Sequence, residues 1–220
     1  MKLDLHIHST YSRDAKATPK DILRFSKKVG MDGLAIADHN AVEGSREIFS
    51  TSASEGLLAV RAVEISAAEG HVLAYGVKEL VPRGLSVVET IEKIHAMGGV
   101  AVAAHPKRFP SGIGLDVVRE AKFDAIEVLN GGSSRRSNSS AKKIAELRNL
   151  PVTGGSDAHE LEQVGKCYTV IEEVSTEADV IEAILKSRTS IGGRSRSTSE
   201  GVRYSIETFI EWLKGDLRRL

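Results

Sequence analysis

The chain of 220 residues is 41% hydrophobic and 27% charged, which is typical of a soluble globular protein that can bury a sizeable core. Its 30 basic and 30 acidic residues cancel, which argues against long nucleic acid or an anionic membrane as a partner but leaves a small phosphorylated ligand open. The single cysteine, Cys167, and the lack of a signal sequence or of a bilayer-length apolar stretch lead us to expect a cytoplasmic protein.

Short apolar runs alternate along the chain with segments of helical periodicity. Two of the predicted helices begin with typical capping residues: Thr18 is followed by Pro19, and Ser86 is followed three residues later by Glu89, the spacing of a capping box. The predicted strands are 2–8, 33–38, 57–66, 71–77, 100–105, 124–130, 151–157, 167–171 and 190–193, and the predicted helices are 18–30, 86–99, 137–149 and 175–187.

This alternation of strands and helices predicts an α/β fold built from parallel βαβ units. Seven or eight such units within about 200 residues indicate a small or distorted (β/α) barrel. No G-x-G-x-x-G follows the first strand, which argues against an open dinucleotide-binding sheet. We expect the barrel to occupy residues 1–192, with its chemistry at the C-terminal ends of the strands.

The remaining segment, residues 193–220, differs from the barrel in composition. A loop rich in serine, arginine and glycine leads to a stretch in which apolar residues recur at helical spacing. We expect a C-terminal amphipathic helix that packs on the barrel. The alternative is a dimerisation helix that forms a homo-oligomer, because an exposed apolar face has to be covered. The apolar residues are Ile206, Phe209, Ile210, Leu213 and Leu217.

Ionisable side chains gather at the ends of the predicted strands. His6 and His8 lie two residues apart on the first strand, so their imidazoles share one face. Asp157 and His159 repeat this spacing after a later strand. Burying many such groups at one barrel mouth is costly unless cations hold them together. The nine candidate metal ligands are His6, His8, Asp14, His39, Glu64, His71, His105, Asp157 and His159.

The chemistry of these candidate ligands indicates the kind of metal. Imidazoles with a few carboxylates suit zinc, manganese or iron, rather than calcium or magnesium alone. A single catalytic metal uses three or four protein ligands, so nine candidates predict two or three divalent ions. A carboxylate such as that of Glu64 could bridge two of them.

Six segments of the chain are DLHIHSTYSRD, ADHN, VEIS followed by a histidine, AHP, IEVLN and GGSDAH. They occur in the order of the motifs of the polymerase and histidinol phosphatase (PHP) superfamily, which this chain resembles from residue 2 to about residue 160. The resemblance implies a distorted (β/α)7 TIM-like barrel and a metal-dependent phosphoesterase with a trinuclear site. Ala37 stands where the family motif usually has threonine. Asp38 is retained, and we expect it to orient a ligand.

The resemblance also implies how the candidate ligands are shared among three metals. The first metal would be held by His6, His8, Glu64 and Asp157. Glu64 would bridge to a second metal, completed by His71 and His105. Asp14, His39 and His159 would hold the third, and the Asp14 position varies within the family. Glu127 and Asn130 match the E-x-x-N element of the family, and Glu127 is either an acceptor behind a ligand or a partner for a basic residue at the edge of the core.

These observations lead us to expect hydrolysis of a phosphomonoester of a small molecule or nucleotide, or of a short oligonucleotide end, by metal-activated hydroxide. Glu64 and Asp157 would act as central ligands, His159 would donate a proton to the leaving group, and Arg135 would bind the phosphate. The alternatives are a histidinol phosphatase and a metal-binding module without hydrolytic activity. Further cations for the phosphate are Lys107, Arg108, Arg136, Arg194 and Arg196.

Overall fold

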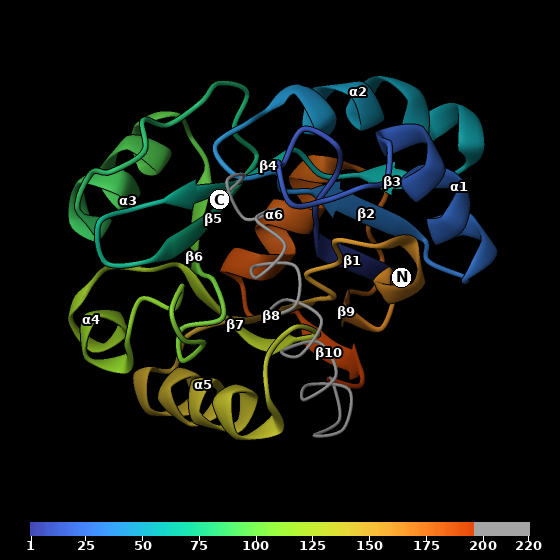
Figure 1. Cartoon of the computed structure of the whole chain (residues 1–220). Coiled ribbons are helices and arrows are strands. Elements are labelled where there is room, and N and C mark those ends of the chain that lie inside the picture. Colours follow the sequence, from blue (N-terminus) through green and yellow to red (C-terminus); the bar gives the residue numbers. More distant parts are fainter. Residues whose placement is uncertain (196–220) are drawn as a thin grey trace, which may run out of the picture.

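The computed structural model describes residues 1–195 as a mixed α/β fold, in which the strands gather in the middle and most helices lie around them (Figure 1). One five-stranded sheet has the order β10-β9-β1-β2-β3 and the other the order β4-β5-β6-β7-β8. The strands are β1 (Lys2–Ile7), β2 (Gly33–Ile36), β3 (Leu58–Ala59), β4 (Ala62–Ser66), β5 (His71–Tyr75), β6 (Val100–Ala103), β7 (Ala125–Asn130), β8 (Val152–Gly155), β9 (Cys167–Val170) and β10 (Ser190–Gly193).

Strand pairing agrees only in part with the expected parallel units. β1, β2 and β3 pair in parallel, as do β6, β7 and β8, whereas β5 is antiparallel to both neighbours and β9 is antiparallel to β1 and β10. The expectation of parallel units is therefore confirmed for β1 to β3 and for β6 to β8, and it is wrong for β5 and β9. Residues 67–70 join β4 to β5, which is too short for the helical crossover that parallel pairing requires.

Two isolated bridges connect the sheets within the described residues. Ile7 pairs with Ala158 next to β8, and His39, beyond the end of β2, pairs with Glu64 on β4. Continuous ladder hydrogen bonding around a closed barrel is not seen in residues 1–195, so the closed barrel stays a prediction. Both bridges lie at candidate ligands or beside them, so the junctions between the sheets place those side chains.

The four predicted helices are present, with two more that were not predicted. The Thr18 side chain accepts a hydrogen bond from the backbone N–H of Asp21, and Ser86 and Glu89 form the expected capping box. The unpredicted α2 has no side-chain cap and includes Gly44, while α4 is only six residues long, so both give weak signals. The helices are α1 (Pro19–Lys28), α2 (Glu43–Thr51), α3 (Val87–Ala96), α4 (Leu115–Glu120), α5 (Arg135–Arg148) and α6 (Glu177–Leu185), with 3₁₀ turns at Ser52–Glu55 and Leu161–Gln163.

β1 is buried on both faces and carries the first candidate ligands. Leu3, Leu5 and Ile7 pack into the apolar clusters, while the alternate face carries Asp4 and His6. β8 approaches this strand closely because Gly155 has no side chain: a Cβ there would lie 2.4 Å from the Cβ of His6. The glycines of the GGSD segment therefore let the residues after β8 reach the polar end of β1.

Residues 196–220, which include the predicted C-terminal helix and Arg196, lie outside the described residues. The boundary between residues 1–192 and 193–220, and the packing or dimerisation of that helix, therefore remain predictions. No helix in the described part is long and apolar enough to cross a membrane.

Cys167 lies on β9 and is completely buried. Burial, together with the negative charge of Asp4, raises the pKa of its thiol to about 12, and a thiol reacts through its thiolate form. We expect the native protein not to react with Ellman's reagent at pH 8, and one thiol per chain to react after unfolding in guanidinium. Rapid reaction of the native protein would contradict this burial.

Candidate metal centre

The structure brings the nine candidate ligands together, and five of the six imidazoles lie beside Glu64. His6 is on β1, Glu64 is on β4, and the others follow the strand ends, except His71, which begins β5. Because β5 is antiparallel to β4 and β6, its first residue lies at the same edge of the sheet as their last residues. Four groups, each of three side chains, have ligand atoms within 4.8 Å of one another: His6, His8 and Asp157; His6, Glu64 and His105; His39, Glu64 and His71; His8, His39 and His159.

The carboxylate of Glu64 is fully buried and divides its two oxygens between two sets of imidazoles. Oε1 lies 3.0 Å from Nδ1 of His71 and 2.9 Å from Nε2 of His105. Burial disfavours the charged form, but the positive charges of His71 and His6 outweigh it and hold the pKa of Glu64 well below its usual range. The position suits a bridging carboxylate.

The second oxygen of Glu64 faces three further imidazole nitrogens. Oε2 lies 3.0 Å from Nδ1 of His39, 3.3 Å from Nε2 of His8 and 3.4 Å from Nε2 of His6. Despite these distances, neither Oε2 nor Nδ1 of His39 has a hydrogen-bond partner, although both atoms are buried. Buried polar atoms that converge without hydrogen bonds are what a cation between them would satisfy.

The two imidazoles of the H-x-H segment point the same ring nitrogen towards this centre. Nδ1 of His6 lies 2.9 Å from Oε1 of Glu127, and Nδ1 of His8 lies 3.1 Å from Oγ of Ser12. The Nε2 atoms then lie 3.2 Å apart. Because Nδ1 of each ring lies against an oxygen behind it, Nε2 is the nitrogen that each ring would offer to a shared cation.

Glu127 lies behind the imidazoles. Besides accepting from His6, it accepts hydrogen bonds from the backbone N–H of His105 at 2.9 Å and from Nδ2 of Asn130 at 3.0 Å. Of the two expectations for Glu127, the structure therefore favours the acceptor behind a ligand.

Asp157 also divides its oxygens. Oδ1 lies 3.2 Å from Nε2 of His8, whereas Oδ2 accepts hydrogen bonds from Asn130, at 3.2 Å, and from the Arg108 guanidinium. Burial opposes ionisation, yet the charges of Arg108 and His6 hold the pKa of Asp157 well below its usual range. Oδ1 of Asp157 thus faces the imidazole of His8, while Oδ2 is held by Asn130 and Arg108.

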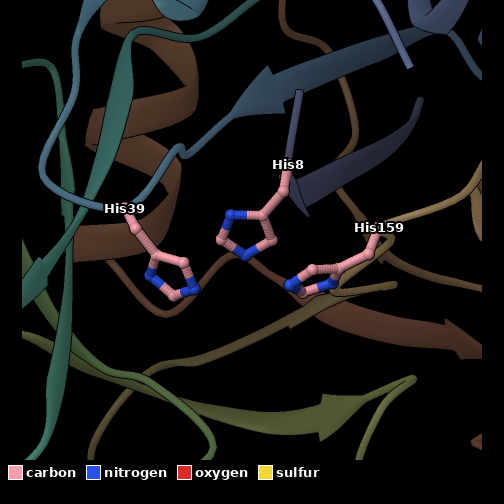
Figure 2. A group of neighbouring side chains, drawn as sticks. All are labelled: His8, His39 and His159. Atoms are coloured by element: carbon pink, nitrogen blue, oxygen red, sulfur yellow. The ribbon is translucent and has the colours of Figure 1, made fainter. Parts of the chain in front are cut away.

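A third group joins segments that are far apart in the sequence (Figure 2). The rings of His39 and His159 lie 4.5 and 4.4 Å from that of His8, measured between centroids. Oδ2 of Asp14 lies 3.1 Å from Nε2 of His159 and 3.5 Å from Nε2 of His39. Burial lowers the pKa of His39, but the carboxylates of Glu64 and Asp14 outweigh this effect and raise the pKa to about 10. His39 faces a carboxylate with each ring nitrogen, so it could serve either neighbouring metal position.

Two of the candidate ligands have an uncommon backbone conformation. His105 has φ of 28° and Asp157 has φ of 52°, a region that costs a non-glycine residue about 1–2 kcal/mol. Such strain concentrates at functional sites, where the surrounding structure holds it in place.

The residues present fit transition-metal ions. They offer imidazole nitrogens and carboxylate oxygens, with one carboxylate between two groups and acceptors behind the rings, and this donor set suits zinc, manganese or iron.

The other predicted cations among the described residues are exposed. Arg135 and Arg136 begin α5 and are exposed, as is Lys107, while Arg194 is exposed beyond β10. His95, on α3 and outside this centre, is exposed and forms an ion pair with Asp124, with 2.7 Å between Nε2 and Oδ2.

Sequence reasoning missed two residues of the surroundings. Asp4 accepts hydrogen bonds from the backbone N–H groups of Ser156 and Gly165, at 2.9 and 2.8 Å, and so ties β1 to the segments after β8. Ser12 contacts both His8 and the backbone of His39. Both residues stand in the DLHIHSTYS segment, but their roles depend on contacts that no spacing reveals.

Comparison with known proteins finds similar sequences for most of the chain. A family model for the PHP domain matches residues 4–150, and a model described as PHP-associated matches residues 135–189. An uncharacterized protein of Methanocaldococcus jannaschii is 37% identical over 141 residues, which cover 59% of this chain and 82% of the relative.

Solved structures share the fold. A two-domain protein of Bacteroides vulgatus, which contains a predicted PHP-like metal-dependent phosphoesterase, superposes with a TM-score of 0.71 at 20% identity over 88% of this chain. This chain spans 65% of that protein. A lesion-specific endonuclease of Pyrococcus furiosus superposes with a TM-score of 0.59 at 19% identity, covering 88% of this chain and 57% of the endonuclease. At these identities the likeness shows the fold alone.

Proposed function

The chain belongs to the PHP domain family, and on that premise we propose that it hydrolyses a phosphomonoester of a small molecule or nucleotide with the help of two or three manganese, zinc or iron ions. The observation that carries the proposal is the position of Glu64, whose two buried oxygens face two different sets of imidazoles.

The distances support a division of the ligands. We assign His6, His8 and Asp157 to a first metal, with Glu64 between it and a second. His71 and His105 complete the second, because both approach Oε1 of Glu64. Asp14, His39 and His159 form the third group.

Metals bound there would supply Lewis acidity and lower the pKa of a water molecule towards 7, which makes a nucleophile available at neutral pH. The protein's own side chains have two further tasks. Arg108, whose side chain is 24% exposed, lies against Asp157 at the edge of the centre, where it can bind a phosphoryl oxygen. His159 donates its Nδ1 proton to the backbone oxygen of Asp157, so its Nε2, beside Asp14, is the nitrogen that would serve the leaving group or a metal.

The two sheets are also compatible with the expected distorted barrel over residues 1–192. Two isolated bridges, Ile7–Ala158 and His39–Glu64, lie where the two sheets meet. They would join the two sheets into one barrel. We propose that this distortion places ligands from antiparallel β5 beside those from parallel strands.

Two alternatives from the same family predict other outcomes. A histidinol phosphatase would act on a phosphorylated amino alcohol, and a metal-binding module without hydrolytic activity would bind the ions without turnover. Eight of the nine candidate ligands belong to the four groups, and Asp14 lies against His39 and His159, which favours an active enzyme.

A panel of phosphomonoesters tests the proposal. Sugar phosphates, nucleotides, nucleoside bisphosphates, short oligonucleotide ends and histidinol phosphate are incubated with the protein, with and without added manganese, and released phosphate is measured. We expect manganese-dependent release from small or nucleotide substrates. Activity on histidinol phosphate alone would support the first alternative, and bound metal without release from any member would support the second.

Replacing Arg108 should weaken substrate binding. A charge-assisted hydrogen bond contributes about 1.5–3 kcal/mol, so Arg108→Ala should raise KM for the best substrate of the panel by roughly 10- to 150-fold. Exposed Arg135 should matter less, because exposed charges contribute about 1 kcal/mol or less. Arg119→Ala, at an exposed arginine paired with Asp116 on α4, is the matched control. An unchanged KM in Arg108→Ala would contradict this role.

A further inference from the structure

The hydroxyl of Ser12 connects the loop after β1 to two of the proposed ligands. Ser12 is only 2% exposed, and its Oγ has three polar neighbours within hydrogen-bond distance. These are Nδ1 of His8 at 3.1 Å, the backbone nitrogen of His39 at 2.9 Å and Oδ1 of Asp38 at 2.9 Å. Asp38 was expected to orient a ligand, and Ser12 is the group through which it can do so.

The direction of each hydrogen bond follows from the atoms involved. A carboxylate has no proton to give, so the Ser12 hydroxyl donates to Asp38. The backbone N–H of His39 can only donate, so it occupies one lone pair of the Ser12 oxygen. A hydroxyl has one proton and two lone pairs, which leaves one lone pair for His8. Nδ1 of His8 must therefore carry a proton and donate it to Ser12.

Asp38 accepts hydrogen bonds from two further donors besides Ser12. The Ser9 backbone N–H and hydroxyl also donate to it, at 2.6 and 2.7 Å, so three donors converge on the carboxylate. The carboxylate is held closely against α2: a Cβ on Gly44 would lie 2.3 Å from Oδ2 of Asp38. It has little freedom to turn away from Ser12.

We propose that Ser12 is a positioning residue that fixes the tautomer of His8, so that Nε2 presents its lone pair to a metal. This inference rests on the proposed metal centre. His6 obtains the same tautomer directly from the carboxylate of Glu127, whereas His8 obtains it through a serine that is itself oriented by Asp38. The same hydroxyl holds the backbone of His39, so one group orients ligands from two segments.

The chain offers a matched control in Ser9. Its hydroxyl also donates to Asp38, and it is as deeply buried as Ser12, but within the described residues its hydroxyl bonds to no imidazole. Ser9→Ala and Ser12→Ala each remove one hydroxyl from Asp38, and only the second removes the acceptor for His8. Ser12→Cys, with a weaker acceptor of similar volume, is expected to fall between the wild type and Ser12→Ala.

Metal affinity is the first measurement, made by competition of the purified protein with a chelator for zinc. Loss of an acceptor behind a metal-ligating histidine typically weakens binding by about 10- to 100-fold, and we expect this for Ser12→Ala. Ser9→Ala should stay close to the wild type. The second measurement is nitrogen NMR of metal-free protein labelled in histidine, in which His8 should be the Nδ1–H tautomer in the wild type and Ser9→Ala, and a mixture in Ser12→Ala.

Unchanged affinity and an unchanged tautomer in Ser12→Ala would overturn the inference. An equal loss in Ser9→Ala would also overturn it, because the loop rather than the contact with His8 would then matter. If the wild type binds no zinc, manganese or iron, the proposed metal centre fails, and the NMR comparison alone decides the role of Ser12. If Ser12→Ala does not fold, Ser12→Cys decides in its place.

Discussion

Glu64→Gln should lower both turnover and metal affinity. The amide keeps the shape of the side chain but replaces one oxygen with an NH₂ group, which cannot ligate and has to face imidazole nitrogens on one side. Loss of several kcal/mol of charge stabilisation corresponds to a fall in kcat on the order of 10³-fold. The metal affinity should fall by at least about 100-fold, the upper end of what loss of a group behind a ligand costs. Phosphate release and chelator competition measure the two effects.

Glu177→Gln is the control for this substitution. Glu177 is also a largely buried carboxylate, 11% exposed, but it pairs with Arg61 and no atom of it belongs to the metal centre. Glu177→Gln should lower the stability of the protein, because Arg61 loses a charged partner. Its metal content should remain that of the wild type. A Glu64→Gln protein with normal metal content and normal turnover would show that Glu64 is only a structural carboxylate.

Removal of metal should lower the melting temperature by a large amount. Six imidazoles and three carboxylates converge in the centre, and an ion that binds only the folded state stabilises it by mass action. At 100 times its Kd, one ion contributes about 2.7 kcal/mol, which is about 5–10 °C for a domain of this size. Differential scanning calorimetry before and after chelation measures the change.

The identity of the added ion should matter for recovery. Zinc, manganese or iron(II) should restore the original melting temperature, whereas calcium should not, because imidazole is a poor ligand for it. In Glu64→Gln the response to every ion should be much smaller. A melting temperature that does not change after complete removal of the metal would contradict a metal centre that supports the fold.

The position of the centre could be predicted from the sequence because side-chain alternation is local. His6 and His8 share a face of a strand by its periodicity alone, and capping signals such as Thr18 and Ser86 mark helices that the structure contains. A set of ligands at strand ends then follows from the α/β pattern, because those ends meet at one edge of the fold.

Pairing direction and the groups behind the ligands could not be predicted in this way. β5 and β6 are antiparallel although α3 separates them, and this depends on tertiary packing that no local pattern encodes. Ser12 and Asp4 act through contacts with residues that the fold brings to them, such as Asp38, Ser156 and Gly165. Arg135 and Arg108 looked alike in the sequence as loop cations, and only the structure places Arg108 against Asp157.

Elemental analysis of protein purified without chelator tests the metal centre most directly. The arrangement around Glu64 predicts two or three zinc, manganese or iron ions per chain in the wild type and a clear loss in Glu64→Gln. Metal content near zero in the wild type, with none taken up after incubation with these three ions, would contradict the account.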